Sequence, residues 1–268
     1  MSQAPQAPAG ITLRAMVPNA ITAVALCLGL TGVRFAIGGE WDKALGSIVL
    51  AGVLDGFDGR IARLLRAESR FGAELDSLAD NIAFGTAPAL VLFLWALNEA
   101  PRFGWIAALA LAVCCALRLA RFNSRIDAIE QPHKSAGFNT GVPAPAGAGL
   151  AFVPMYLWLV LPDEGAREFV RSWPVVMAWT LFIAALLISS IPTYGWTSIR
   201  LRRSNRLFAI AFAALLVTAL VIEPWWTLLA ICAVYFICLP FASASYAKIR
   251  RRRASAAQPK PDATSVAS

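Results

Sequence analysis

The sequence predicts an all-α, polytopic membrane protein with about eight transmembrane helices. Its 268 residues are 58% hydrophobic and only 15% charged, whereas globular proteins are about 45–50% apolar and about 25% charged. The apolar residues also gather in long runs, and one helical crossing of a bilayer needs about 20 such residues. The eight runs extend over Ile11–Ile37, Lys43–Leu65, Leu75–Leu97, Trp105–Ala120, Ala144–Leu161, Trp173–Ile191, Leu207–Ile222 and Trp225–Tyr246.

The basic residues predict the orientation of these crossings. Of the 24 Lys and Arg residues, 19 lie near the start of the first run or around the ends of the second, fourth, sixth and eighth runs, and few lie in the alternate loops. The positive-inside rule then places both termini in the cytoplasm, which agrees with an even number of crossings. We therefore assign the net charge of +8 to topology and contact with anionic lipids, and we expect no nucleic-acid partner.

The runs differ in their local features. The first run is long enough to begin with an interfacial segment, and we expect it to remain as the first helix because it lacks a convincing signal-peptide cleavage site. The fifth run opens with "VPAPAGAG", in which Pro143 and Pro145 suit the start of a helix and the small residues suit close packing. The five cysteines show neither disulfide nor zinc spacing, so we expect them to pack as small apolar residues.

Four aspartates stand out at the boundary between the second and third runs, in "LDGFDGRIARLLRAESRFGAELDSLAD". Asp55 and Asp58 are three residues apart, and Asp76 and Asp80 are four apart, so each pair lies on one face of a helix. A hairpin between the two runs would bring these faces together near the cytoplasmic boundary. Carboxylates at membrane depth are costly and indicate a functional site. The competing interpretation is that they cap helices or pair with arginines of the loop.

The ligand chemistry of this cluster favours a hard divalent cation. Carboxylate oxygens are the ligands that Mg²⁺, Mn²⁺ and Ca²⁺ prefer, and the absence of a nearby His or Cys argues against zinc. Mg²⁺ is commonly held by a few carboxylates together with substrate phosphates. Arg63 can form paired hydrogen bonds with phosphate, and Gly59, Ala62 and Gly72 leave room for a bulky ligand. The sequence therefore predicts a phosphorylated ligand.

The same residues match a known pattern, D-x2-D-G-x2-A-R-x8-G-x3-D-x3-D, without a gap or substitution. This pattern resembles the signature of the CDP-alcohol phosphatidyltransferase family, whose members transfer a phosphatidyl or similar group from a CDP-linked donor to an alcohol and release CMP. The resemblance implies a six-helix core. We expect that core in residues 1–200, two additional transmembrane helices in residues 201–246 and a disordered basic tail in residues 247–268.

The resemblance also implies roles for individual residues. Asp55, Asp58, Asp76 and Asp80 would hold two divalent cations, Mg²⁺ or Mn²⁺, and Asp80 would also be the general base. Ca²⁺ is expected to occupy the site without supporting turnover. The implied contacts to CDP-diacylglycerol are Pro18, Asn19, Ala20, Ile21, Gly59, Ala62, Arg63, Ser69 and Gly72.

Two later stretches bear on the acceptor alcohol. "RLARFN", which ends at Asn123, and the following "GVPAPA" resemble the bacterial membrane-embedded branch of the family that uses serine. The resemblance implies that L-serine and CDP-diacylglycerol give phosphatidylserine and CMP. We interpret Arg118, Arg121 and Asn123 as candidate contacts to serine, whereas ordinary positive-inside placement explains the two arginines equally well.

Other interpretations stay open at this point. The same family uses glycerol 3-phosphate, choline or inositol phosphate as acceptors, and Arg118 and Arg121 do not exclude them. An ion-coupled transporter is a more distant alternative, because the acidic cluster has no second copy of the kind expected from inverted repeats. The family resemblance further implies an enzyme of the cytoplasmic (inner) membrane, surrounded by membrane lipids, with its active site facing the cytoplasm. A homodimer is an expected arrangement, although no residue identifies its interface.

Overall fold

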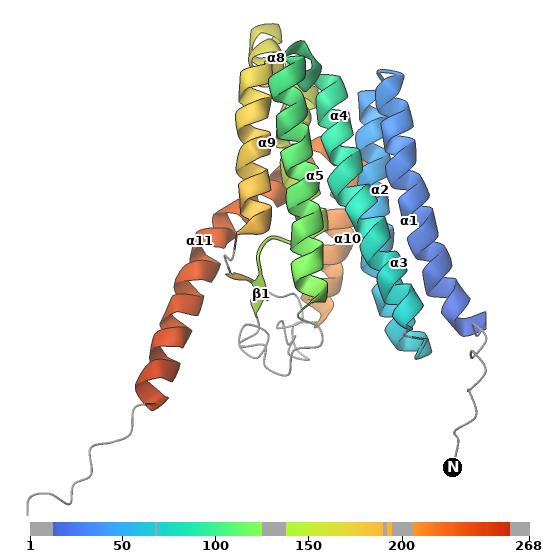
Figure 1. The fold of residues 1–268 in the computed structure, drawn as a ribbon, viewed down its shortest axis with the longest axis vertical. Helices are drawn as coiled ribbons and strands as arrows, with labels where there is room; N and C mark the ends of the chain where they lie inside the picture. Colours follow the sequence, from blue (N-terminus) through green and yellow to red (C-terminus); the bar gives the residue numbers. More distant parts are fainter. Residues whose placement is uncertain (1–12, 68, 125–137, 190–191, 195–205, 258–268) are drawn as a thin grey trace, which may run out of the picture.

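The computed structural model describes residues 13–67, 69–124, 138–189, 192–194 and 206–257. The regular structure of these residues is helical except for one short antiparallel pair of strands, in which Phe138 lies opposite Tyr194. Most of the helices stand side by side, whereas the last one leans away from the others (Figure 1). The elements are α1 (Leu13–Ile37), α2 (Trp41–Leu65), α3 (Arg70–Asp80), the π-helix η1 (Asn81–Thr86), α4 (Ala87–Trp95), the 3-10 turn η2 (Leu97–Glu99), α5 (Pro101–Asn123), β1 (Phe138–Thr140), α6 (Ala144–Ala151), α7 (Val153–Val160), α8 (Glu164–Arg171), α9 (Trp173–Ile188), β2 (Pro192–Tyr194), α10 (Arg206–Ile222) and α11 (Pro224–Ala257).

Each of the eight predicted runs is helical over its described residues, with three differences. The third run is α3, η1 and α4 in succession, and the fifth is divided into α6 and α7 near Phe152, because Pro154 has no backbone N–H to continue the helical hydrogen bonds. The last helix continues to Ala257, past the expected boundary at Tyr246, in a segment rich in Ala and Arg, which favour helix. Residues 258–268 of the expected tail lie outside the described part.

Four described helices are long and apolar enough to cross a membrane, and five are if the bent pair α8 and α9 forms one span. The four cover Met16–Ile37, Arg70–Trp95, Pro101–Asn123 and Pro224–Phe241, and the axes of α8 and α9 meet at 52°. The second half of α2 carries two aspartates and two arginines, which lower its apolar character. The fold is thus that of a helical membrane protein, while the number of eight crossings stays a prediction.

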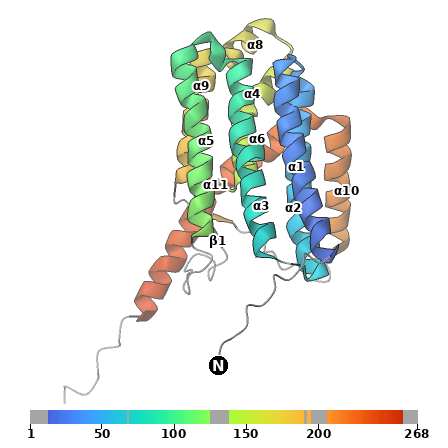
Figure 2. The same cartoon turned by 45° about the vertical axis from the view of Figure 1, so that its right-hand side comes forward.

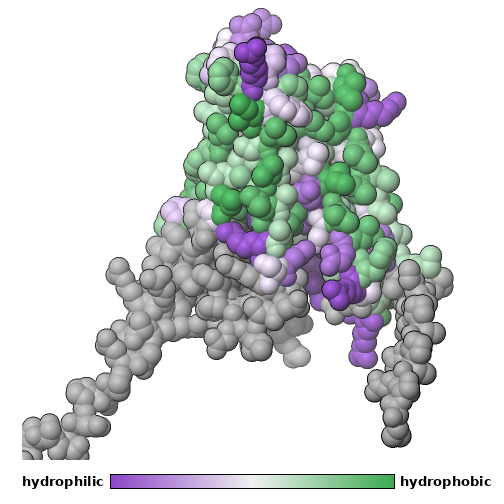
Figure 3. Space-filling view, in the orientation of Figure 1, coloured by the Kyte–Doolittle hydropathy of each residue, from purple (hydrophilic) through white to green (hydrophobic). Residues whose placement is uncertain are grey.

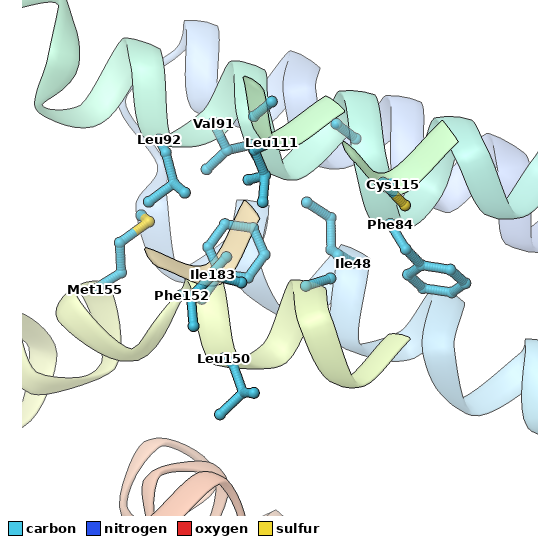
Figure 4. Close-up of a cluster of buried hydrophobic side chains, with 14 of the residues drawn as sticks. Ile48, Phe84, Val91, Leu92, Leu111, Cys115, Leu150, Phe152, Met155 and Ile183 are labelled. Atoms are coloured by element: carbon cyan, nitrogen blue, oxygen red, sulfur yellow. The ribbon is translucent and has the colours of Figure 1, made fainter. Parts of the chain in front are cut away.

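The buried core lies where α2, α4, α5, α6 and α9 meet. Ile48 of α2, Leu111 of α5 and Ile183 of α9 point into one cluster (Figure 4), together with Phe152 and Met155. Small residues let the helices approach each other, as is common in membrane proteins. A Cβ added at Gly104 of α5 would lie 2.0 Å from the carbonyl oxygen of Leu97, so only glycine fits there.

The polar residues gather at the two ends of the helices. In Figure 3 an apolar band covers the middle of the molecule, and hydrophilic side chains lie above and below it. At the lower end a hydrophilic strip rises into the apolar band beside α3. The start of α1, the end of α2, the start of α3 and the end of α5 all lie at this lower end (Figures 1 and 2). The predicted site residues of α1, α2, α3 and α5 therefore lie near the same end of the molecule.

Candidate active site

A sharp turn positions the two aspartate-bearing segments. Helix α2 is closed by Arg66, which has a left-handed backbone conformation with φ of 50°. Helix α3 begins after Ser69, whose hydroxyl accepts a hydrogen bond of 3.0 Å from the backbone N–H of Gly72. This is an N-cap, which satisfies a backbone donor that the first turn of a helix leaves free. Ser69, expected to contact the donor, therefore also has a structural role in starting α3.

Three of the four aspartates converge. Carboxylate oxygens of Asp55, Asp76 and Asp80 all lie within 4.8 Å of one another, and each of these residues is half-buried. Asp55 comes from α2, whereas Asp76 and Asp80 come from successive turns of α3. Among the described residues, no arginine forms an ion pair with any of these aspartates, because the only ion pair found there joins Lys43 to Glu40. The competing idea that they pair with arginines of the loop therefore finds no support.

The fourth aspartate is held differently. Asp58 is only 5% exposed, and its Oδ2 accepts a hydrogen bond of 2.7 Å from the hydroxyl of Thr22 in α1. Its Oδ1 accepts a hydrogen bond of 2.5 Å from the backbone N–H of Gly59. Asp58 does not belong to the group of three within 4.8 Å. The structure thus fixes Asp58 through α1, next to the converging group rather than inside it.

The early segment of α1 also reaches the start of α3. A Cβ added at Gly72 would lie 2.9 Å from Oδ1 of Asn19 and 3.1 Å from the hydroxyl oxygen of Ser69. The absence of a side chain at Gly72 therefore lets Asn19 lie against the N-terminus of α3. Pro18 is buried beside it, while Ala20 is exposed and Ile21 half-buried. Within this segment, Asn19 is the residue that lies next to Ser69 and Gly72, which are also predicted contacts to the donor.

The remaining predicted donor contacts lie on the last turns of α2. Arg63 is exposed, and Ala62 is half-buried. A Cβ added at Gly59 would have one neighbour within 4 Å, the Nη1 of Arg63, at 3.7 Å. The guanidinium of Arg63 thus lies over the surface that Gly59 leaves uncovered.

A π-helix follows Asp80 directly and keeps α3 close to its neighbours. Within it, a Cβ added at Gly85 would lie 3.0 Å from the Cβ of Cys115 in α5, and a Cβ added at Gly29 of α1 would lie 2.8 Å from the Cα of Ala83. Such π segments are rare and frequent at functional sites. Helix α1 packs against this π segment through Ala83, and α5 packs against it through Gly85. These contacts hold the backbone that directly follows Asp80.

The polar end of α5 places the three candidate acceptor residues in different surroundings. Arg118 is half-buried and lies close enough to Asp80 to interact with it electrostatically. Arg121 donates hydrogen bonds of 2.9 Å to the carbonyl oxygens of Ile188 and Ser189, at the end of α9. Asn123 donates a hydrogen bond of 2.8 Å to the hydroxyl of Ser77, next to Asp76.

These contacts separate the three candidates. Arg118 is the member within electrostatic range of the aspartate group, and its Nε is buried with no hydrogen-bond partner among the described residues. Buried donors in proteins almost always have a partner, so this atom indicates where an acceptor group of a ligand would bind. Arg121 uses two of its nitrogen atoms to hold α9, which is a structural role.

The sequence interpretation missed two residues and one contact at this site. Thr22 ends the segment "PNAIT", which the family resemblance places near the nucleotide, but nothing in the pattern pointed to its contact with Asp58. Ser77 lies beside Asp76 and holds Asn123. Asn81 follows Asp80, and its buried Oδ1 has no hydrogen-bond partner among the described residues. A polar side chain directly after Asp80 in an apolar run was the available signal for Asn81.

The residues present fit a divalent cation. The group of three offers oxygen atoms only, from two helices and within a short distance, which suits hard cations such as Mg²⁺ or Mn²⁺. The fold and this site define a helical membrane protein whose carboxylate group can bind a metal ion at one end of the helices.

Comparison with known proteins gives the family. The model of CDP-alcohol phosphatidyltransferases matches residues 15–191, and that of "CDP-alcohol phosphatidyltransferase 2" matches residues 205–240. The chain therefore belongs to the CDP-alcohol phosphatidyltransferase family, as the signature had indicated.

Several relatives carry the name CDP-diacylglycerol–serine O-phosphatidyltransferase. The one from Mycobacterium leprae is 37% identical over 242 residues, which cover 90% of this chain and 79% of the relative. The one from Mycobacterium tuberculosis is 37% identical over 238 residues, covering 89% of this chain and 81% of the relative. The one from Methanocaldococcus jannaschii is 34% identical over 192 residues, covering 71% and 79%.

Proposed function

We propose that the protein transfers the phosphatidyl group of CDP-diacylglycerol to the hydroxyl of L-serine, giving phosphatidylserine and CMP. The observation that carries this proposal is the convergence of Asp55, Asp76 and Asp80 beside Arg118, in a chain with the complete family signature. The names of the relatives support serine as the acceptor.

The donor would bind across the ends of α1, α2 and α3. Gly59 leaves the backbone of α2 uncovered, and Arg63 beside it can form charge-assisted hydrogen bonds with a donor phosphate. Asn19 and Ser69 lie together at the start of α3, where the nucleotide would contact the protein. Pro18, Ala20, Ile21 and Ala62 would line this surface. The acyl chains can stay in the bilayer because the site lies where the hydrophilic strip enters the apolar band (Figure 3).

Asp55, Asp76 and Asp80 would hold one divalent cation, and Asp58 would join them in holding a second. Such ions would neutralise and align the donor pyrophosphate, which is the main requirement of phosphoryl transfer. The hydrogen bond from Thr22 orients the Asp58 carboxylate for this purpose. Mg²⁺ and Mn²⁺ are the expected ions, and Ca²⁺ is expected to bind without supporting turnover.

The chain's own residues would carry out the remaining steps. Arg118 would bind the serine carboxylate through its guanidinium, with Asn123 fixed nearby on Ser77. The serine hydroxyl oxygen attacks the phosphorus that bears the diacylglycerol, and the bond from this phosphorus to the bridging oxygen breaks, so that CMP leaves. The hydroxyl proton passes to the carboxylate of Asp80, whose position makes it the general base.

The same proposal includes the placement in the membrane. The protein would cross the cytoplasmic membrane eight times with both termini and the site on the cytoplasmic side, because basic residues gather in those loops. Residues 1–200 would form the catalytic core, and residues 201–246 would add two helices. In agreement with this topology, α1 begins and α11 ends toward the same end of the molecule (Figure 1).

The first experiment measures CMP release by the purified protein with CDP-diacylglycerol and Mg²⁺ or Mn²⁺. L-serine is compared with glycerol 3-phosphate, choline and inositol phosphate. Release that requires both serine and a metal supports the proposal. Release with another acceptor alone would retain the family and reject serine, and metal-independent release would reject the role of the aspartates.

A second arm separates the base from the metal ligands. Asp55→Asn should recover part of its activity at high metal concentration, because it weakens binding of the cation. Asp80→Asn should stay inactive at every metal concentration, because it also removes the base. Equal recovery of both variants would contradict the role of Asp80 as general base.

A further inference from the structure

A hydrogen bond between side chains joins the end of α5 to the helix that carries Asp76 and Asp80. Asn123, the last residue of α5, donates from its Nδ2 to the hydroxyl oxygen of Ser77 at 2.8 Å. Ser77 lies on α3 between the two aspartates, and its own hydroxyl donates to the backbone carbonyl of Ala73 at 3.0 Å. The hydrogen bonds therefore run in one direction, from α5 through Ser77 into the backbone of α3.

Asp76 and Ser77 connect the same turn of α3 to two different helices. The Asp76 carboxylate lies within 4.8 Å of a carboxylate oxygen of Asp55 on α2, whereas the Ser77 hydroxyl is held by Asn123 on α5. Like-charged carboxylates repel each other unless a cation or a proton neutralises them. A fixed position of this turn therefore needs a contact that does not depend on the cation, and the hydrogen bond from Asn123 is such a contact.

The packing of α3 increases the importance of this hydrogen bond. The backbone of α3 packs closely against α1 and continues into η1, but it makes few close approaches to α2 or to α5. Ser77 and Asn123 are both half-buried, so their hydrogen bond is partly shielded from competing water. Side chains rather than backbone packing thus set the position of α3 relative to α5.

The donor of this hydrogen bond is itself on an anchored segment. Two residues before Asn123, Arg121 donates hydrogen bonds of 2.9 Å to the carbonyl oxygens of Ile188 and Ser189 at the end of α9. These bonds fix the last turn of α5. Because an anchored group has less conformational freedom to lose, it can hold its partner at a smaller entropic cost.

We propose that Asn123 is a positioning residue for the metal site, which acts through Ser77 to hold the Asp76 turn of α3 in place for a divalent cation. This inference rests on the proposed function in assigning Asp76 to the cation. It connects α9, α5 and α3 in one series of hydrogen bonds, and it leaves Arg118 as the candidate contact to the acceptor.

The first test measures Mn²⁺ binding to the purified full-length protein by electron paramagnetic resonance, in which bound Mn²⁺ is lost from the signal of the free ion. Ser77→Ala removes the acceptor of the hydrogen bond, and Asn123→Leu removes the donor at similar size. Each should raise the Kd for Mn²⁺ about threefold to tenfold, which is the effect of one hydrogen bond.

The matched control is Ser47→Ala on α2. The Ser47 hydroxyl donates to the carbonyl of Lys43 four residues earlier, as Ser77 does to Ala73, but no described residue donates to it. Ser47→Ala should change the Kd for Mn²⁺ by less than about twofold. Equal Kd values for Ser77→Ala and Ser47→Ala would overturn the proposal.

Two further variants test the hydrogen bond itself. Ser77→Thr keeps a hydroxyl and should bind Mn²⁺ within about twofold of the unmodified protein. The double variant Ser77→Ala with Asn123→Leu should bind no more weakly than either single variant, because both changes remove the same bond. A Ser77→Thr protein as weak as Ser77→Ala, or multiplicative losses in the double variant, would contradict the positioning role.

Kinetics separate positioning from direct contact with serine. Ser77→Ala and Asn123→Leu should both raise the Mn²⁺ concentration for half-maximal CMP release about threefold to tenfold, while the serine KM at saturating Mn²⁺ changes less than about twofold. A serine KM that rises only in Asn123→Leu would make Asn123 a contact to serine and would overturn the proposal.

A readout without metal keeps this inference separate from the proposed function. Hydrogen exchange of the α3 amides in metal-free protein, followed by mass spectrometry, should be about threefold faster or more in Ser77→Ala than in Ser47→Ala. An unchanged rate would overturn the inference. If exchange and Mn²⁺ binding change as expected but the unmodified protein releases no CMP with serine, the proposed function alone fails. Absence of Mn²⁺ binding by the unmodified protein would reject both.

Discussion

The Arg70–Trp95 span and the Pro224–Phe241 span are both long apolar helical segments, but they place their side chains in opposite ways. Over an 18-residue apolar stretch of each span, 50% is buried in the first and 6% in the second. The first packs small residues inward and carries Asp76 and Asp80, whereas the second exposes Val234, Phe236 and Phe241. The converging aspartates thus lie in the region whose helices enclose one another.

The same contrast separates α5 from α10. Leu111 of α5 is 1% exposed and belongs to the core, whereas Leu215 of α10 is 67% exposed. Lipid chains are as apolar as leucine, so a lipid-exposed leucine favours insertion of its helix into the membrane but does not determine how the helix packs. A buried leucine instead determines the distance between helices. Matched substitutions therefore give different results according to how closely each residue is packed and whether it lies at the site, and four pairs test this.

The largest difference is expected for loss of a carboxylate. Asp80→Asn should lower kcat about a thousandfold or more, because it removes both a metal ligand and the base. Glu223→Gln, the same change at the exposed junction of α10 and α11, should leave kcat within about twofold. CMP release measures both. Comparable activity of the two variants would remove the distinction between the regions.

The second pair concerns stability. Leu111→Ala should lower the free energy of unfolding by about 2–5 kcal/mol, because it leaves a cavity in the core. Leu215→Ala should change it by less than about 0.5 kcal/mol, since lipid or detergent fills the space. The two variants are compared by heating them in detergent and measuring the fraction of protein that stays folded at each temperature. Equal losses would show that α10 packs against protein.

The third pair concerns two threonine hydroxyls. Thr22→Val removes the hydrogen bond to Asp58 and should lower kcat/KM about tenfold, because hydrogen bonds to charged groups contribute about 1.5–3 kcal/mol. Thr218 donates only to the carbonyl oxygen of Ala214 in its own helix, so Thr218→Val should have little effect. Metal titration of CMP release should also show weaker apparent metal binding in Thr22→Val. Unchanged metal binding there would separate Asp58 from the cation.

The smallest effect is expected for two glycines. A Cβ at Gly72 would press on the amide of Asn19 at 2.9 Å, and we expect Gly72→Ala to raise the KM for CDP-diacylglycerol about threefold to tenfold. At Gly149, which faces α11, the nearest atom would be the sulfur of Cys232 at 3.9 Å, an ordinary contact. Gly149→Ala should therefore leave the donor KM unchanged. A rise in both variants would point to a general effect on packing.

Much of the fold could be predicted because helix formation depends on local patterns. The apolar runs identified the helices, and the three- and four-residue spacings placed each aspartate pair on one face. The boundary of α11 was the weakest part, because its basic continuation is polar but also favours helix. The π segment after Asp80 was not predictable, since its close contacts with α1 at Ala83 and with α5 at Gly85 join residues far apart in the chain.

The sequence by itself determined which residues are chemically able to form the site. The signature from Asp55 to Asp80, the helices that carry it and the family all follow from the order of residues along a short stretch. The tertiary structure decided how these residues are used. It separated Asp58, held by Thr22, from the converging three, and it assigned Arg121 to α9 while leaving Arg118 within electrostatic range of Asp80. Those contacts join helices far apart in the chain, and only the packing of the whole molecule sets their distances.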